Sequence, residues 1–315
     1  MTTTPRPLCC IVGPTAAGKS ALALQLAQAR GLSIISADSR QLYRHFDVGT
    51  AKPTREEQAL APHYGIDCVD PVERYSAHRW AESAGHWCRE AAEQGAPPLI
   101  VGGTGLYVRA LVQPLAAVPS LDDERRRLLA PWLDALDRAQ LQRWCDRLDP
   151  PRARLGRTQQ LRAVETALLS GTRISDALRG SEEESAAPIV PVRYLVVDPG
   201  PVLAARIEVR VHAMVAAGFV EEIERLRSQV PPDAPAWNAS GYGVMRDAVE
   251  GRLSLRAAID RVIIETRQYA KRQRTWFRHQ LPMQQVLRID PLAPMALAET
   301  LAWWDAAYLQ DGEHE

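Results

Sequence analysis

The chain has 315 residues, of which 46% are hydrophobic and 24% are charged. This length and composition are typical of a soluble globular protein with a sizeable core, in one large domain or two. The 38 basic and 38 acidic residues cancel to a formal net charge of zero. That balance excludes a general basic coat for nucleic acid, although local basic patches remain open. No uncharged apolar run approaches the ~18 residues of a membrane helix, so we expect no membrane association.

The N-terminus and the cysteines both favour a cytoplasmic protein. The first residues are weakly basic and are soon broken by proline and glycine, unlike a signal peptide. The five cysteines form no Cys-x-x-Cys pair and have no ligand-like spacing to histidine. We therefore expect neither a zinc site nor a disulfide framework, and a reducing compartment.

A phosphate-binding loop follows the first apolar run, residues 7–12. The sequence GPTAAGKS fits the pattern G-x-x-x-x-G-K-[ST], and residues 20–30 continue with helical spacing. Backbone N–H groups of such a loop favour anionic oxygens, Lys19 would neutralise a terminal phosphate and Ser20 could hold Mg²⁺. The predicted diphosphate-binding residues are Gly13, Pro14, Thr15, Ala16, Ala17, Gly18, Lys19 and Ser20.

Further strands and helices alternate along the chain. Apolar runs at 32–36, 98–101 and 194–197 predict strands, which predicts an α/β fold: a P-loop NTPase-like parallel sheet core. Ligands of such sheets bind beyond the carboxyl ends of the strands. Asp38 and Thr104 lie at two such ends, so we expect both to face the phosphate loop.

A helical insertion interrupts this pattern. Residues 120–187 have charged helical patterns, many arginines and no clear strand. We expect a discontinuous core of residues 1–118 plus 191–308, an insertion at 119–190 and a disordered tail at 309–315. The run 181–188 predicts an exposed hinge or loop. Near the C-terminus, residues 255–278 predict a long basic helix.

Lysine is rare in this chain. Only Lys19, Lys52 and Lys271 accompany 35 arginines. Because arginine and lysine differ in shape, hydration and phosphate geometry, these positions could require lysine. Drift in codon usage is the alternative.

The role of Asp38 cannot be assigned from its position alone. A P-loop NTPase usually has a second acid for Mg²⁺ at another strand end, but the candidate strand ends in LIVGGTG. Asp38 is the only comparable acid near the loop. It could be a helix cap, a metal ligand or a general base.

Four segments, in order, resemble the tRNA dimethylallyltransferase family over nearly the whole chain. They are SADSRQLYRHFDVGTAKP, DPVERYSA, LIVGGTGLYVRAL and ETRQYAKRQRTWFRHQ. The resemblance implies transfer of a dimethylallyl group from dimethylallyl diphosphate to N6 of the adenosine 3′-adjacent to the anticodon. The phosphate loop would then hold a prenyl diphosphate, with Mg²⁺ as cofactor, in a cytoplasmic protein that we expect to be a monomer.

The resemblance also assigns catalytic roles. Asp38 would accept the proton of the attacking amine. Lys19 and Arg210 would stabilise the leaving diphosphate, and Thr104 would contact the diphosphate or the target base. Arg206, one helical turn before Arg210, either shares that face or lies on a solvated one.

The same resemblance implies contacts with a tRNA anticodon stem-loop, from which the adenosine is flipped out. Trp276 and Phe277 would stack on bases there, although Trp276 could belong to the core. The insertion as a whole would clamp the stem-loop. The implied tRNA-binding residues are Asp38, Ser39, Arg40, Gln41, Thr104, Arg126, Gln159, Arg162, Lys271, Arg272, Arg274 and Arg278.

The chain departs from the family pattern at RNA contacts. Gln159 replaces an expected arginine, an H-P-N-D segment is missing, and Gly243 stands where a basic residue is usual. These changes bear on tRNA affinity more than on reaction type. The zinc finger of eukaryotic members is absent, which favours a bacterial type.

Three other functions remain open. One is an adenylate isopentenyltransferase acting on free AMP, ADP or ATP, which would need neither the insertion nor KRQRTWFR. Another is a P-loop kinase, which the missing strand-end acid disfavours. The third is an RNA-binding protein with a degenerate P-loop site, although Lys19, Ser20, Asp38 and Thr104 are all retained.

Overall fold

The computed structural model describes residues 6–113, 119, 121–184 and 190–308. The chain divides into two compact units. The larger unit comprises Met1–Val112 with Val190–Glu315, and the smaller unit is Gln113–Ile189.

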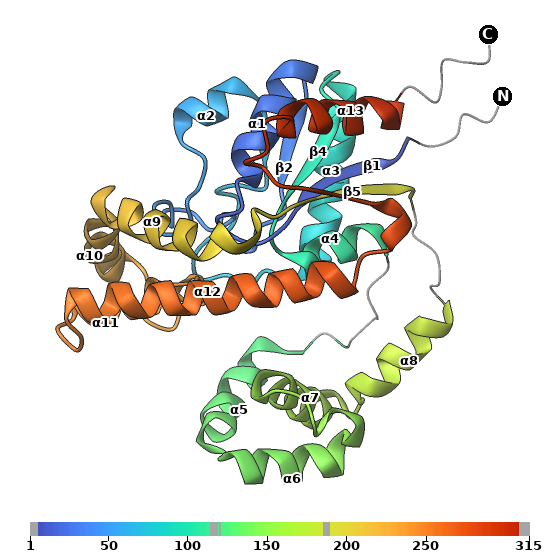
Figure 1. The fold of residues 1–315 in the computed structure, drawn as a ribbon. Helices are drawn as coiled ribbons and strands as arrows, with labels where there is room; N and C mark the ends of the chain where they lie inside the picture. Colours follow the sequence, from blue (N-terminus) through green and yellow to red (C-terminus); the bar gives the residue numbers. More distant parts are fainter. Residues whose placement is uncertain (1–5, 114–118, 120, 185–189, 309–315) are drawn as a thin grey trace. The chain divides into compact units, whose positions relative to one another are not determined.

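The larger unit is built on a six-stranded sheet in which every strand pair is parallel (Figure 1). This confirms the predicted α/β fold class. The strand order is β3-β2-β4-β1-β5-β6. The strands are β1 (Leu8–Val12), β2 (Ser33–Ser36), β3 (His63–Tyr64), β4 (Pro98–Gly102), β5 (Val192–Val197) and β6 (Val286–Ile289).

Four of these strands follow from apolar runs in the sequence, and two do not. β1 lies between β4 and β5, and all three are almost wholly buried, so their sequences are apolar apart from Arg193 in β5. β3 has only two residues. β6 pairs with β5 and exposes Leu287 and Arg288, so it lacks an apolar run.

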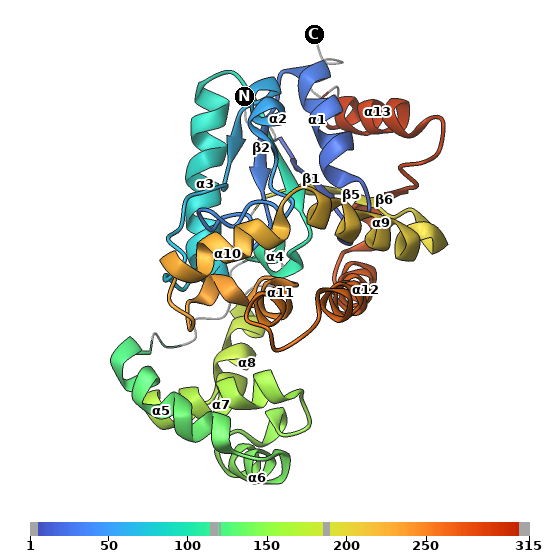
Figure 2. The ribbon, with the colours of Figure 1, turned by 90° about the vertical axis from the view of Figure 1, so that its left-hand side faces the viewer.

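Helices cover both faces of the sheet. Helices α1 and α13 lie on one face and α3 and α4 on the other (Figure 2). Beyond them, α9–α12 pack on one another. The helices of this unit are α1 (Lys19–Arg30), α2 (Arg55–Leu60), α3 (Ala77–Glu93), α4 (Gly105–Val112), α9 (Leu203–Ala216), α10 (Phe219–Gln229), α11 (Tyr242–Val249), α12 (Leu255–His279) and α13 (Ala296–Tyr308).

The smaller unit is helical wherever it has regular structure among its described residues. It contains α5 (Asp123–Ala135), α6 (Arg138–Leu148), α7 (Arg157–Ser170) and α8 (Ile174–Glu184). Its core comprises Leu133, Leu136, Leu141, Cys145, Ala153, Ala163 and Val164.

Helix α8 corrects one prediction. It continues through Glu184, so residues 181–184 are helical rather than part of a hinge loop. Residues 185–188 and the predicted tail, 309–315, lie outside the described residues. No helix among the described residues is long and apolar enough to cross a membrane.

Candidate active site

Three loops meet at the carboxyl edge of the sheet, where β1, β2 and β4 end. Because parallel strands end at the same edge, residues 13–20, 37–41 and 102–104 come together there. They surround one pocket, which α9 and α12 complete. Its polar lining includes Thr15, Lys19, Ser20, Ser36, Asp38, Arg40, Gln41, Thr50, Arg210, Thr266, Tyr269 and Gln273.

The cations Lys19 and Arg210 and the carboxylate of Asp38 lie together in the polar part of the pocket. The Lys19 ammonium donates a 2.7 Å hydrogen bond to the carbonyl of Pro14. Burial lowers the pKa of Lys19 to about 8; the charge of Arg210 acts in the same direction and that of Asp38 opposes it. Burial also lowers the pKa of Arg210, again opposed by Asp38. Positive charge is thus concentrated where a phosphate-binding loop needs it.

Arg206 contacts the phosphate loop. Its Nε donates a 3.0 Å hydrogen bond to the carbonyl of Ala16, inside the phosphate loop. The side chain therefore supports the loop, and the solvated-face alternative is wrong.

Asp38 closes a turn and caps no helix. Its Oδ1 accepts a 2.9 Å hydrogen bond from the backbone N–H of Arg40, and residues 39–41 are a turn. The helix-cap alternative is therefore wrong. The carboxylate is half-buried and lines the pocket, where it is available to a ligand.

Thr104 joins the ends of β2 and β4. Its N–H donates to the carbonyl of Ala37 at 3.1 Å, and its Oγ1 accepts the N–H of Ser39 at 3.0 Å. Tyr269 of α12 lines the same pocket, and burial raises the pKa of this tyrosine to about 12. The hydroxyl of Tyr269 is therefore protonated and able to donate at neutral pH.

Gln273 is a site residue that the sequence reasoning missed. Its Oε1 accepts the N–H of Thr15 at 2.8 Å, and its Nε2 donates to the carbonyl of Gly103 at 2.9 Å. The residue is 6% exposed. A Cβ on Gly103 would lie 2.3 Å from Nε2, so any larger residue at position 103 would displace the Gln273 amide. One sequence signal could have found it. Gln273 follows Thr266 by seven residues and Tyr269 by four, a spacing that places all three side chains on one face of a helix.

The remainder of the pocket is apolar. Side chains from the sheet, α9, α10 and α12 provide a lining that suits a hydrocarbon chain. These residues are Ile34, Ile66, Val101, Ile207, Val211, Met214, Phe219 and Val262.

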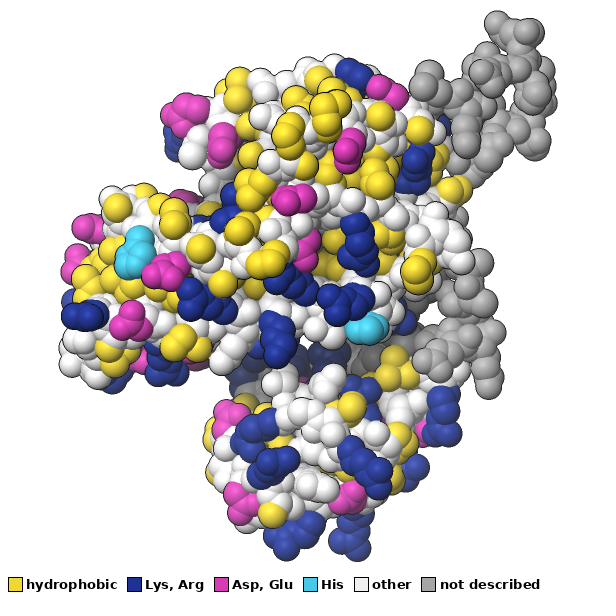
Figure 3. Space-filling view, in the orientation of Figure 1, with side chains coloured by type: hydrophobic (Ala, Val, Ile, Leu, Met, Phe, Trp, Pro, Cys, Tyr) yellow, Lys and Arg dark blue, Asp and Glu magenta, His cyan; other side chains and the backbone are white. Residues whose placement is uncertain are grey.

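A second depression adjoins the pocket and is rich in arginine. The two share the lining residues Arg40, Ala239, Ser240 and Tyr269. Figure 3 shows Lys and Arg side chains along the face over α12. The arginines of this arginine groove are Arg40, Arg246, Arg252, Arg261 and Arg272. Arg246, Arg252 and Arg261 form ion pairs with neighbouring carboxylates.

The predicted RNA-binding residues have different surroundings in the larger unit. Arg40 and Arg272 line the arginine groove, whereas Lys271 and Arg278 are exposed on α12. Arg274 is held by Asp198, with Nε 2.9 Å from Oδ2.

Two further RNA-contact predictions concern side chains with internal roles. The Gln41 amide donates to the carbonyl of Ala51 at 3.0 Å. Phe277 is only 1% exposed, so the prediction that it stacks on bases is wrong: it belongs to the core.

The smaller unit contains three predicted contacts. Arg126 forms a bidentate ion pair with Glu165, with Nε 2.9 Å from Oε1 and Nη2 3.0 Å from Oε2. Gln159 accepts the N–H of Gly156 at the start of α7, and Arg162 is exposed. An RNA role for these residues stays a prediction.

Comparisons with known proteins agree with this site. The family model described as IPP transferase matches residues 41–280, and one described as isopentenyl transferase matches residues 7–62. A tRNA dimethylallyltransferase of Gloeobacter violaceus is 42% identical over 275 residues, 85% of this chain and 88% of its own. That of Burkholderia ambifaria is 40% identical over 307 residues, 94% of both chains.

The chain belongs to the IPP transferase family. A full-length tRNA isopentenylpyrophosphate transferase of Bacillus halodurans has a similar structure, with a TM-score of 0.69 and 30% identity over 98% of both chains. A eukaryotic dimethylallyltransferase acting on tRNA shares the fold of the present chain, with a TM-score of 0.77 at 23% identity. That alignment covers 97% of this chain and 80% of the eukaryotic chain.

Proposed function

We propose that this protein transfers a dimethylallyl group from dimethylallyl diphosphate to N6 of the adenosine 3′-adjacent to the anticodon in tRNA. The observation that carries the proposal is a single pocket combining a phosphate loop, the Asp38 carboxylate and an apolar lining. The donor has a diphosphate and a five-carbon chain, and the pocket has a complementary part for each.

The reaction exchanges one bond for another at the allylic carbon. The N6 amine of adenosine attacks C1 of the dimethylallyl group while the C1–O bond breaks, and diphosphate leaves with the bonding electrons. The proton released from N6 passes to the carboxylate of Asp38, since an exocyclic amine is a poor nucleophile without a base. Thr104 holds the turn of Asp38 in place for this step by accepting the N–H of Ser39.

Negative charge grows on the diphosphate as it leaves. The N–H groups of residues 13–20, the Lys19 ammonium and the Arg210 guanidinium oppose it. Ser20, which lines the pocket, would hold Mg²⁺ through its hydroxyl, since this ion binds few protein oxygens alongside phosphates. Among the described residues, no group of three or more His, Cys, Asp and Glu side chains is placed to hold a metal ion. When bound, the ion supplies positive charge to the leaving group.

The RNA reaches the pocket through the arginine groove. The target base must leave its stack to enter, and Ser39, Arg40 and Thr104 line the opening. Lys271, Arg272 and Arg278 on α12 provide phosphate contacts. We also propose that the protein acts as a cytoplasmic monomer; its cysteines are all unpaired, as in a reducing compartment.

Binding of the donor should depend on pH through Lys19, whose pKa is about 8. Below that pH the ammonium is already charged, so the KM for dimethylallyl diphosphate should be flat. Above it, binding requires proton uptake, and KM should rise by up to about tenfold per pH unit. Steady-state kinetics from about pH 6.5 to about pH 9.5 would measure this. In Lys19→Arg the rise should vanish, because a guanidinium stays protonated; a flat wild-type profile would contradict the prediction.

Replacing Lys271 by alanine should weaken tRNA binding. The loss of one phosphate contact should also reduce the slope of log Kd against log salt by about one. Filter binding at several salt concentrations measures both. Arg89→Ala, an exposed cation on α3, is the matched control. An unchanged slope in Lys271→Ala would leave this residue without a phosphate role.

The proposed function is tested on a synthetic anticodon stem-loop RNA. Nucleoside analysis after incubation with dimethylallyl diphosphate should find N6-isopentenyladenosine. The same RNA with guanosine in place of the target adenosine should give none. Modification of that control RNA at other adenosines would contradict the assigned position.

A further inference from the structure

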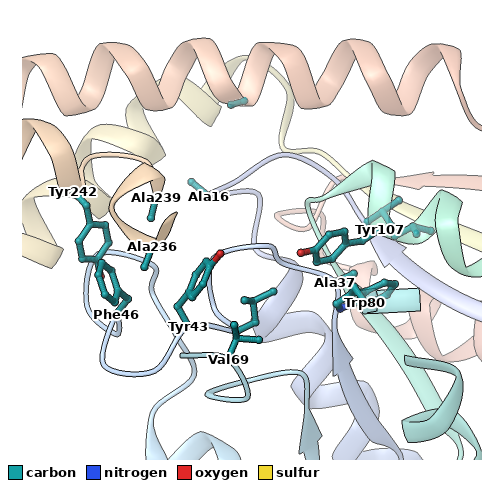
Figure 4. Close-up of a cluster of buried hydrophobic side chains, with 14 of the residues drawn as sticks. Ala16, Ala37, Tyr43, Phe46, Val69, Trp80, Tyr107, Ala236, Ala239 and Tyr242 are labelled. Carbon is teal, nitrogen blue, oxygen red and sulfur yellow. The ribbon is translucent and has the colours of Figure 1, made fainter. Parts of the chain in front are cut away.

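Residues 46–51, here the wall loop, form one side of the substrate pocket. Gly49 and Thr50 are among the lining residues, next to Phe219 of α10. A Cβ on Gly49 would lie 2.2 Å from the Phe219 ring and 2.6 Å from that of Tyr242, so the backbone itself packs on both rings. Figure 4 shows Phe46 beside Tyr242, with ring centroids 4.8 Å apart. The wall is therefore backbone pressed against aromatic rings.

A buried carboxylate holds this loop. Glu222 of α10 is 3% exposed, and its Oε2 accepts the N–H groups of Asp47 and Val48 at 3.0 and 2.8 Å. Its Oε1 accepts the Tyr242 hydroxyl at 2.5 Å and the N–H of Gly49 at 3.4 Å. A buried charge is tolerated only with such partners, so the carboxylate and the loop conformation depend on each other.

Lys52, the residue directly after the wall loop, stabilises the same loop. Its side chain is 4% exposed, and its ammonium contacts Asp47 and Asp67, each at 2.5 Å. It also donates to the carbonyl of Tyr43 at 2.9 Å. Three convergent acceptors suit a compact ammonium better than a planar guanidinium, which accounts for lysine at this position.

The wall loop is linked to the turn that contains Asp38. The carbonyls of Thr50 and Ala51 accept the Gln41 amide at 3.4 and 3.0 Å. Gln41 Oε1 in turn accepts the Ser36 hydroxyl at 3.0 Å. Movement of the loop would therefore reach both the apolar wall and the reacting end.

We propose that Glu222 is a positioning residue that presses the wall loop onto Phe219 and thereby restricts the donor to a five-carbon chain. This inference rests on the proposed function. Glu222 touches no substrate; it acts through the backbone of residues 47–49. Without its carboxylate, Gly49 is free to leave the Phe219 ring, and the apolar part of the pocket gains room for a longer prenyl chain.

The test is donor preference, measured as kcat/KM for geranyl diphosphate relative to dimethylallyl diphosphate with one tRNA. In Glu222→Ala this ratio should rise about tenfold, the discrimination that a hydrophobic wall provides against a longer chain. The KM for tRNA should stay within about twofold, because the arginine groove is not altered. Glu221→Ala, its exposed neighbour on α10, is the matched control and should keep the wild-type ratio.

Two more conservative variants keep the test decisive if Glu222→Ala does not fold. Glu222→Gln retains an acceptor for Asp47 and Val48 and should shift the ratio by about threefold. Tyr242→Phe removes only the hydroxyl and should shift it less. An unchanged ratio in a folded Glu222 variant of lowered thermal stability would overturn the proposal, as would failure of Glu222→Gln to fold. A wild-type protein that modifies no tRNA would instead refute the proposed function.

Discussion

Replacing Asp38 by asparagine should leave diphosphate binding intact and lower kcat by about 10²–10⁴-fold, the usual contribution of a general base. Asparagine can still accept the Arg40 N–H through Oδ1, so the turn persists while the basic oxygen is lost. Single-turnover transfer to tRNA measures the chemical step, and equilibrium binding of diphosphate measures the loop.

The control for this variant is another aspartate with the same local contact. Asp70 accepts the N–H of Val72 at 3.1 Å, two residues ahead, as Asp38 does with Arg40. Asp70→Asn should keep wild-type turnover. If Asp38→Asn also did so, Asp38 would be a residue that only closes a turn.

Replacing Lys19 by alanine should lower kcat/KM for dimethylallyl diphosphate by about 10²–10³-fold. The ammonium is buried beside Arg210, where its charge is weakly screened and acts on the leaving diphosphate. We expect KM to rise and kcat to fall, because the charge on the diphosphate grows during the reaction. Affinity for tRNA should not change.

A cation on the same helix provides the comparison. Arg30 lies at the other end of α1, paired with Asp305 at 2.6 Å. Arg30→Ala should alter stability slightly and leave kcat/KM unchanged. A loss of less than about threefold in Lys19→Ala would contradict the electrostatic role assigned to the ammonium.

The sequence predicted the part of the site that follows from local pattern. GPTAAGKS between an apolar run and a helix predicts a phosphate loop, and parallel strands bring Asp38 and Thr104 to the same edge. Both statements depend on neighbours in the chain. The resemblance then supplied the reaction, which no spacing of residues would have given.

The sequence did not predict contacts between distant segments. Gln273 and Thr15 are 258 positions apart, and nothing local to either indicates that they meet. Arg272 and Arg274 are two residues apart on α12, yet one lines the arginine groove and the other is held by Asp198. Their side chains leave the helix in different directions. Asp198, which binds the Arg274 guanidinium, directly follows β5. A basic run therefore predicts a basic helix without saying which of its side chains are free.

Glu222 shows the same limit for buried charge. In FVEEIERL it stands beside Glu221, and residue type alone does not distinguish the two. One is exposed and the other is 3% exposed, bound to three backbone N–H groups. The amphipathic period predicts which position faces inward, but it cannot predict that a loop 173 to 175 residues earlier supplies the donors.

The most direct test of the proposed function is prenyl transfer from labelled dimethylallyl diphosphate, run in parallel with unmodified tRNA and with AMP. The arginine groove beside the pocket predicts label in tRNA alone. Label in AMP alone would contradict the account and assign the protein to enzymes that prenylate free nucleotides. Label in neither acceptor, with tRNA still bound, would show an RNA-binding protein whose phosphate loop no longer supports transfer.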